Sequence, residues 1–186
     1  MKRTLTLAIV AGLHCCLAFA TGVFPEPDFN RFSDRHFDDT PEWVEESAKL
    51  PAFPRDSDLI EFTVSAATAN HFFIDGATLA VGSDAVVRYT LVIRAAGGAS
   101  NISYEGMHCG IGSVKRYAVG RSDGTWSWLR SGDWQPIENK LANRQYAALS
   151  REYFCPLGNP IRSADEGRDA LRRGGHPATN TSPYKR

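Results

Sequence analysis

The fold of this chain is decided by the stretch Val86-Val87-Arg88-Tyr89-Thr90-Leu91-Val92-Ile93-Arg94. It is rich in β-branched and aromatic residues, which favour β-strands. Alternate residues from Val87 to Ile93 are apolar or aromatic and share one face of such a strand, while the opposite face is half polar. The stretch therefore predicts a central, half-buried strand bounded by turns at residues 82–84 and 97–100.

Shorter runs of the same kind lie on either side of this strand. Apolar residues alternate with polar ones around Ile60, and further short runs occupy residues 72–74, 79–81, 102–105, 114–120 and 125–129, separated by turn residues. Residues 139–154 instead carry apolar residues at a helical spacing. The sequence predicts an α+β fold, in which a twisted antiparallel sheet of short hairpin-connected strands packs against a C-terminal amphipathic helix.

The chain of 186 residues is long enough for one well-packed domain. We predict a signal peptide over residues 1–20, an acidic leader with a short helix over 21–58, the globular α+β domain over 59–155 and a mostly disordered tail over 156–186. The leader helix is predicted from Pro41 to Lys49, because Thr40 suits the N-cap and Pro41 the first helical position. A short helix over residues 165–173 is the only structure considered for the tail.

The N-terminus has the features of an export signal. Lys2 and Arg3 precede an apolar run, and Ala18-Phe19-Ala20 provides small residues for a signal peptidase, so we predict cleavage after Ala20. Lipidation of Cys15 or Cys16 is the alternative, but neither follows the small residue that this modification needs. No later segment approaches about 20 uninterrupted apolar residues, so no transmembrane segment is expected in the mature chain.

Cleavage after Ala20 leaves two cysteines, Cys109 and Cys155. In the oxidising periplasm or outside the cell, two cysteines most simply form one disulfide. The formal net charge of the chain is +0, which gives no general attraction to nucleic acid or to an anionic membrane. We therefore expect a periplasmic or secreted protein that does not bind nucleic acid.

Catalytic and cofactor-binding motifs are missing from the sequence. It has no phosphate-binding loop, no dinucleotide-binding glycine pattern, no His-Glu-x-x-His and no Cys-x-x-Cys, so no cofactor and no metal site are predicted. His108 beside Cys109 is badly placed to activate its neighbour, since adjacent strand residues point to opposite faces. His71, His108 and Asp75 lack a metal-ligand spacing, and Asp75 and Asp123 precede glycines in ordinary turns.

Basic and aromatic residues alternate along the central hairpins. We predict a binding surface on their polar side, with Arg88, Glu105 and Arg116 as ionic groups and Tyr104 and Trp126 as flat contacts. Its partner would be an envelope protein, a peptide or a glycan, and a buried position for most of these five residues would contradict the prediction. The alternative is a small envelope hydrolase with Glu105 or His108 as general base, in a polar pocket that brings Glu105 near His71, His108 or Asp75.

Several blocks of the sequence, in this order, resemble the CNP1-like family of proteobacterial envelope proteins. They are residues 72–76, 82–84 leading into 87–92, 101–106 ahead of Cys109, 123–126, and the ending Tyr153-Phe154-Cys155. The likeness extends from about Leu50 to Cys155. It implies a secreted or periplasmic domain, and it supplies no catalytic residues.

Overall fold

An 8-stranded antiparallel sheet forms the centre of the structure. The computed structural model describes residues 42–130, 132–140 and 143–180. The predicted signal peptide and most of the acidic leader therefore lie outside the described residues. The strands are β1 (Leu59–Phe62), β2 (His71–Asp75), β3 (Ala80–Val81), β4 (Val86–Arg94), β5 (Ser100–His108), β6 (Ser113–Gly120), β7 (Trp126–Trp128) and β8 (Gln135–Pro136).

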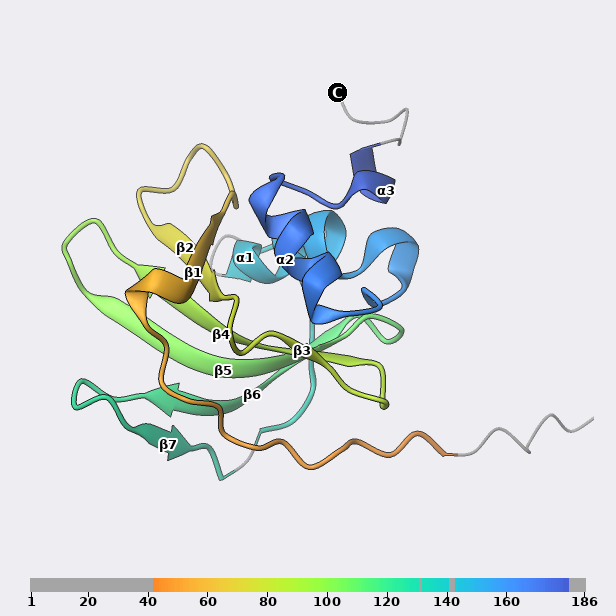
Figure 1. Cartoon of the computed structure of the whole chain (residues 1–186), viewed down its shortest axis with the longest axis horizontal. Coiled ribbons are helices and arrows are strands. Elements are labelled where there is room, and N and C mark those ends of the chain that lie inside the picture. Colours follow the sequence, from red (N-terminus) through yellow and green to blue (C-terminus); the bar gives the residue numbers. More distant parts are fainter. Residues whose placement is uncertain (1–41, 131, 141–142, 181–186) are drawn as a thin grey trace, which may run out of the picture. The chain divides into compact units, whose positions relative to one another are not determined.

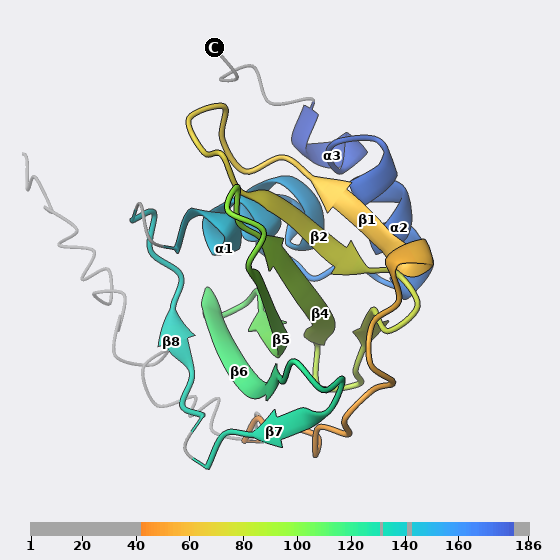
Figure 2. The ribbon, with the colours of Figure 1, turned by 90° about the vertical axis from the view of Figure 1, so that its left-hand side faces the viewer.

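The predicted central strand is confirmed as β4. It pairs with β2 and β3 on one side and with β5 on the other, in the order β1-β2-β4-β5-β6-β7 (Figure 2). Leu91 faces Ile74 of β2, and Tyr89 faces Glu105 of β5. Because paired residues in an antiparallel sheet project to the same side, this register fixes which side chains share a face.

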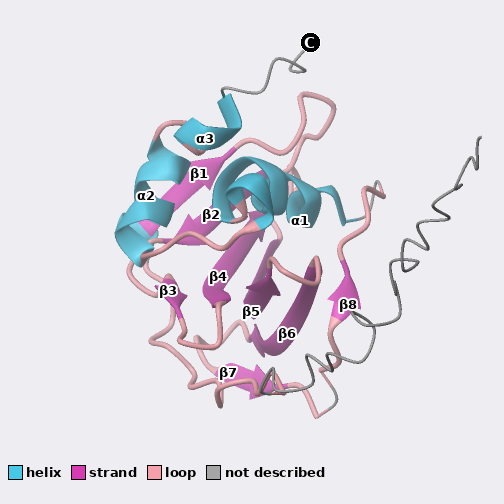
Figure 3. Cartoon of the chain, turned by 90° about the vertical axis from the view of Figure 1, so that its right-hand side faces the viewer, coloured by secondary structure: helices cyan, strands magenta, loops and turns pink. Residues whose placement is uncertain are grey.

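Helices cover one face of the sheet, which we call the helix face (Figures 1 and 3). They are α1 (Arg144–Ala148), the π-helical segment η4 (Leu149–Phe154), α2 (Ala164–Arg172) and α3 (Pro177–Asn180). Leu149, Tyr153 and Phe154 pack here against Val87 and Leu91 of β4 in the main core. The α+β fold is thus confirmed, and none of the helices in the described part of the chain is long and apolar enough to cross a membrane.

The predicted C-terminal helix begins later than expected, at Arg144 rather than near residue 139. Just before the predicted helix, Gln135 pairs with Val114 in β6, and the Ile137 amide donates to the carbonyl oxygen of Gly112. Asn139 and Lys140 are not helical, so they belong to the connection between this sheet edge and α1. Leu141 and Ala142 lie outside the described residues.

The prediction of a mostly disordered tail from residue 156 is wrong for residues 156–180. Helix α2 is capped by the Ser163 hydroxyl, which accepts from the Glu166 amide, and Ile161 and Leu171 lie in the main core. Gly167 packs so closely that an added Cβ would lie 2.6 Å from Ile161 and 2.7 Å from Leu79. Small residues give the helix its close approach to the core, and they also make its apolar face inconspicuous in the sequence. The short helix considered at 165–173 is confirmed.

The predicted helix from Pro41 to Lys49 is also wrong. Residues 42–49 have no helical structure. Residues 43–53, which we call the strap, run across the second face of the sheet (Figure 1), where Ala48 and Leu50 pack on Tyr104, Tyr117 and Ala118. These contacts outweigh the local preference for a helix, which is only a weak constraint in a short segment.

Both faces of β4 are consequently buried, although the sequence pattern predicted a half-buried strand. The strand is buried from Val86 to Val92. Arg88 and Thr90, on the second face, are 6% and 0% exposed. The Thr78 hydroxyl donates to Thr90, so the chain between β2 and β3 contributes to this covering.

The predicted disulfide between Cys109 and Cys155 is present, with a sequence separation of 46. Cys109 follows β5 and Cys155 follows η4, so the bond joins the sheet to the helices. Both residues are buried in the main core.

Loss of this disulfide should destabilise the domain. For a loop of this length, chain entropy predicts roughly 4 kcal/mol, and measured values usually fall between about 2 and 5 kcal/mol. We expect the double variant Cys109→Ala/Cys155→Ala to lose this much unfolding free energy in urea titrations, and the reduced wild-type protein to match it. A loss below about 1 kcal/mol would show that helix packing holds without the bond.

Candidate functional site

A β-bulge between β5 and β6 organises the polar residues of the sheet. Tyr104 faces Ala118 while Glu105 faces Arg116, so Tyr117 is an extra residue on β6. The bulge leaves Arg116 beside Glu105 on the helix face and puts Tyr117 next to Ala118 on the strap face. Bulges commonly redirect side chains beside functional sites.

Glu105 is a fully buried carboxylate on the helix face, at 0% exposure. Its Oε1 accepts from the Ser103 hydroxyl at 2.7 Å, the Tyr146 hydroxyl at 3.0 Å and Arg116 Nε at 3.2 Å. Arg116 Nη2 also donates to the Tyr146 hydroxyl at 2.9 Å. A buried charge needs such compensation, and the network links β5 and β6 to α1.

This network borders a pocket of about 360 Å³. Its lining combines strand residues and the start of α1: Leu91, Ile93, Ser100, Asn101, Ile102, Ser103, Glu105, Arg116, Val119, Gly120, Asn143, Gln145 and Tyr146. The Arg116 side chain is 49% exposed, whereas Glu105 is the buried partner. A ligand in this pocket would therefore meet a guanidinium, amide groups and hydroxyl groups.

The electrostatics of the network keep Arg116 charged. Burial by itself would lower the pKa of Arg116, but Tyr146 and Glu105 raise it above its ordinary value. Burial and the Glu105 charge raise the pKa of Tyr146 to about 12, so its hydroxyl remains protonated and can donate. Among the described residues, three side-chain atoms are buried and lack hydrogen-bond partners: Glu105 Oε2 and the Tyr89 hydroxyl on the helix face, and Arg88 Nε on the strap face.

A second polar network holds the strap. Asp84 and Arg88 form a buried ion pair of 2.6 Å, and Arg88 Nη2 also donates to the carbonyl oxygen of Glu46. The Trp43 indole donates to the Asp84 carbonyl oxygen, and the Glu46 amide donates to the Asp84 carboxylate. Burial alone would raise the pKa of Asp84, but Arg88 and backbone amides lower it.

Glu45 anchors the strap to side chains of β6 and to Trp134. Its carboxylate accepts from Lys115 Nζ at 2.8 Å, the Tyr117 hydroxyl at 2.8 Å and the Trp134 indole at 3.1 Å. Burial acts to raise the pKa of Glu45, but these hydrogen bonds outweigh it and hold the pKa below its ordinary value. Gly106 leaves room for this arrangement, since a Cβ there would lie 2.5 Å from the Tyr117 hydroxyl.

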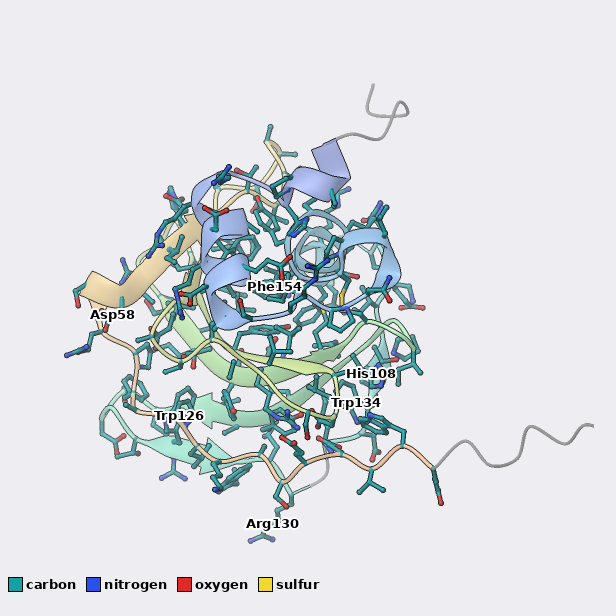
Figure 4. All side chains as sticks on the ribbon, turned by 45° about the vertical axis from the view of Figure 1, so that its right-hand side comes forward. Asp58, His108, Trp126, Arg130, Trp134 and Phe154 are labelled. Carbon is teal, nitrogen blue, oxygen red and sulfur yellow. A yellow bond between two sulfur atoms is a disulfide. The ribbon has the colours of Figure 1, made fainter. Side chains whose placement is uncertain are left out.

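The five residues predicted to share one exposed surface do not form it. Arg88, Tyr104 and Glu105 are buried, at 6%, 5% and 0% exposure. Arg88 and Tyr104 lie on the strap face, where Trp126 is half-buried against Tyr104 and Phe53 (Figure 4). Glu105 and Arg116 come together on the helix face, away from the pair Tyr104 and Trp126 on the strap face. The bulge and the covered second face, which separate the two pairs, are not visible in a sequence pattern.

The other candidate residues have separate surroundings. His71 pairs with Glu61, and the Asp75 carboxylate accepts from the Ala77 amide in a turn. His108 packs edge to face against Trp134 (Figure 4) and against Trp43. The Asp123 carboxylate accepts from the amide and the hydroxyl of Thr125, in the turn that the sequence indicated. In the described part of the chain, no three or more His, Cys, Asp or Glu residues are grouped to hold a metal ion.

Sequence reasoning missed the contribution of α1 to the pocket. The Tyr146 hydroxyl completes the Glu105 network, although the helical spacing over residues 139–154 indicated only an apolar face. Gln145, which is 7% exposed, and Asn143 also line the pocket. The helical period gives these positions, but only the sheet register shows which strand residues they meet.

Replacing Glu105 by Gln should lower the unfolding free energy by about 1–3 kcal/mol, because Arg116 and Tyr146 lose a charged acceptor. Urea titration of the purified variant measures this. The matched control is Glu138→Gln, whose side chain is 53% exposed and pairs with Lys140 at the surface; it should change stability by less than about 0.5 kcal/mol. Equal effects of the two variants would contradict a structural role for the network.

The strap should be held less tightly at low pH. A carboxylate with a lowered pKa in the folded state stabilises the fold above its unfolded pKa of about 4.3, and this stabilisation is lost as the pH falls through the folded value. We expect Glu45→Gln to lose about 1–3 kcal/mol at pH 7 relative to wild type and less at pH 3.5. Urea titrations at both pH values test this, and a pH-independent difference would contradict it.

Comparisons with known proteins assign the family of the chain. No match was found among curated proteins, and none was found among solved structures. The model of the CNP1-like family matches residues 38–172, which include the strap, the whole sheet and helix α2. The predicted resemblance is confirmed and extends further in both directions than expected: the chain belongs to the CNP1-like family.

Proposed function

We propose that this protein is an exported, non-catalytic binding module of the cell envelope, and that its ligand occupies the pocket beside Glu105 and Arg116. The N-terminal sequence supports export, since Lys2 and Arg3, an apolar run and Ala18-Phe19-Ala20 match a cleavable signal. A disulfide in the core is consistent with an oxidising compartment such as the periplasm.

One observation carries the binding role. The pocket offers an exposed guanidinium, that of Arg116, held in place by a buried carboxylate and by the Tyr146 hydroxyl. The two bonded neighbours limit the rotamers of Arg116, so less conformational entropy is lost when a ligand binds. A preorganised polar group in a concave site is typical of ligand recognition.

A hydrolase with Glu105 or His108 as general base is the weaker alternative. Oε1 of Glu105 already accepts from three donors, and its unpartnered Oε2 is buried, so neither oxygen is open to a water that could serve as nucleophile. His108 Nδ1 accepts from the Ile111 amide, and its ring lies between Trp43 and Trp134. Among the described residues, Glu105 bonds to an arginine and to a tyrosine whose pKa is raised to about 12, and the His108 ring bonds to a backbone amide, so neither has a carboxyl or imidazole partner for acid and base catalysis.

The test uses protein purified from the periplasmic fraction, whose intact mass should correspond to a chain beginning at Thr21. Pools of short peptides and of oligosaccharides are added to the isotope-labelled protein and followed by amide NMR and mass spectrometry. We expect shift changes at pocket residues, such as Ser103 and Gln145, with one pool and no change in ligand mass. Conversion of a ligand would favour the hydrolase, and shifts confined to other regions would contradict this binding site.

A further inference from the structure

A second pocket of about 410 Å³ adjoins the first. Ile93 and Gln145 line both pockets, so the two lie side by side at the start of α1, and together they are called the cleft. The second pocket is the more apolar of the two, with Val64, Ala67 and Phe72 in its wall beside Ser65, Thr68 and Asn70. The cleft therefore has an apolar end and a polar end, with Gln145 between them.

The exposed charge in the cleft is positive. Arg116 lines the polar pocket and Arg144 lines the apolar one. Glu105 is the one carboxylate among the residues that line either pocket, and it is fully buried. Within the described residues, Arg116 donates through Nε and Nη2, so its Nη1 edge stays available. A guanidinium edge of this kind binds a carboxylate through two parallel hydrogen bonds.

Gln145 provides a second, independent indication of a ligand. The residue is 7% exposed, and its side-chain amide makes no hydrogen bond within the described part of the chain. Its amide atoms are not among the buried polar atoms that lack a partner, so they remain accessible from the pockets that the residue lines, where a peptide group of a ligand would satisfy both the donor and the acceptor. Ser100, Asn101 and Asn143 add similar groups at the polar end.

We propose that this cleft binds the C-terminal end of a peptide that finishes with an aliphatic residue. The terminal carboxylate contacts Arg116, the last peptide group contacts Gln145, and the aliphatic side chain enters the pocket formed by Val64, Phe72 and Ile93. This inference rests on the proposed binding function, and it names the class of ligand that the binding module recognises. A fatty acid has a carboxylate and an aliphatic chain as well, but it has no peptide group for Gln145.

Three probes distinguish the possible ligands in calorimetric titrations of the protein: acetyl-Gly-Gly-Leu with a free carboxylate, the same tripeptide as its C-terminal amide, and octanoate. We expect the free acid to bind at least about tenfold more tightly than either of the others. Amide NMR should place its shifts at Ile93, Ser103 and Gln145. Equal affinities for the acid and the amide would overturn recognition of the carboxylate but not the proposed binding function. Tighter binding of octanoate would show that the ligand is an acyl chain and not a peptide.

Variants separate the contributions of the two anchors. Arg116→Gln should lower the affinity for the free acid about tenfold and leave the affinity for the amide unchanged, whereas Gln145→Leu should lower the affinity for both peptides alike. Arg121→Gln is the matched control, because Arg121 is exposed in the turn after β6 and bonds to Ser127; it should bind like wild type. Since Arg116 also partners Glu105, melting curves accompany each titration. A second variant, Gln145→Glu, adds a negative charge to the cleft and leaves Arg116 in the sequence, so it should also weaken the acid more than the amide. The proposal is overturned if the free acid still binds as tightly to both Arg116→Gln and Gln145→Glu as to wild type. It is also overturned if none of the three probes binds. The peptide and oligosaccharide pools test the binding function separately.

Discussion

The extra residue of β6 at the Tyr104/Glu105 position is the constraint on which the rest of the structure depends. In a regular ladder, Arg116 and Ala118 would project to one face and Tyr117 to the other. The bulge instead places both Tyr117 and Ala118 on the strap face and leaves Arg116 with Glu105 on the helix face. One irregular position thereby gives the sheet two polar networks, one on each side, and each network fixes a different segment of the chain.

The strap explains how a sheet with charged residues on its second face can be buried on both sides. An antiparallel sheet commonly leaves one face in water, and Arg88 would be expected there. In this protein Asp84 neutralises Arg88, and the Glu46 carbonyl oxygen takes a further donor. Trp126 binds the strap in a similar way, since its indole donates to the Pro51 carbonyl oxygen. The strap is thus held mainly by side chains that recognise its carbonyl and carboxylate oxygens.

The parts of this fold that were predictable from sequence are those that depend on local periodicity or on having only one possible cysteine pair. Alternation identified β4 and its neighbours, and the predicted removal of Cys15 and Cys16 with a signal peptide left one possible disulfide, which is present. Three errors share a different cause. The helix expected at Pro41–Lys49, the disordered tail and the shared binding surface all depended on long-range contacts: Glu45 with Lys115, Gly167 with Leu79, and the bulge beside Glu105. None of these contacts has a signature in nearby residues.

The two polar networks differ in how far the chain itself supplies their hydrogen-bond partners. This difference is the main reason to look for a ligand on the helix face. On the strap face, Glu45 and Glu46 are supplied by the chain itself, and they occupy Lys115, Tyr117 and Ser83. On the helix face, Glu105 satisfies only part of Arg116, and Gln145 has no protein partner among the described residues. Buried polar groups carry a cost unless they are bonded. The strap removes most of that cost on its face, where Arg88 Nε is left buried without a partner among the described residues. On the helix face, the donors and acceptors that lack a protein partner border an open cleft, where a ligand or water completes them.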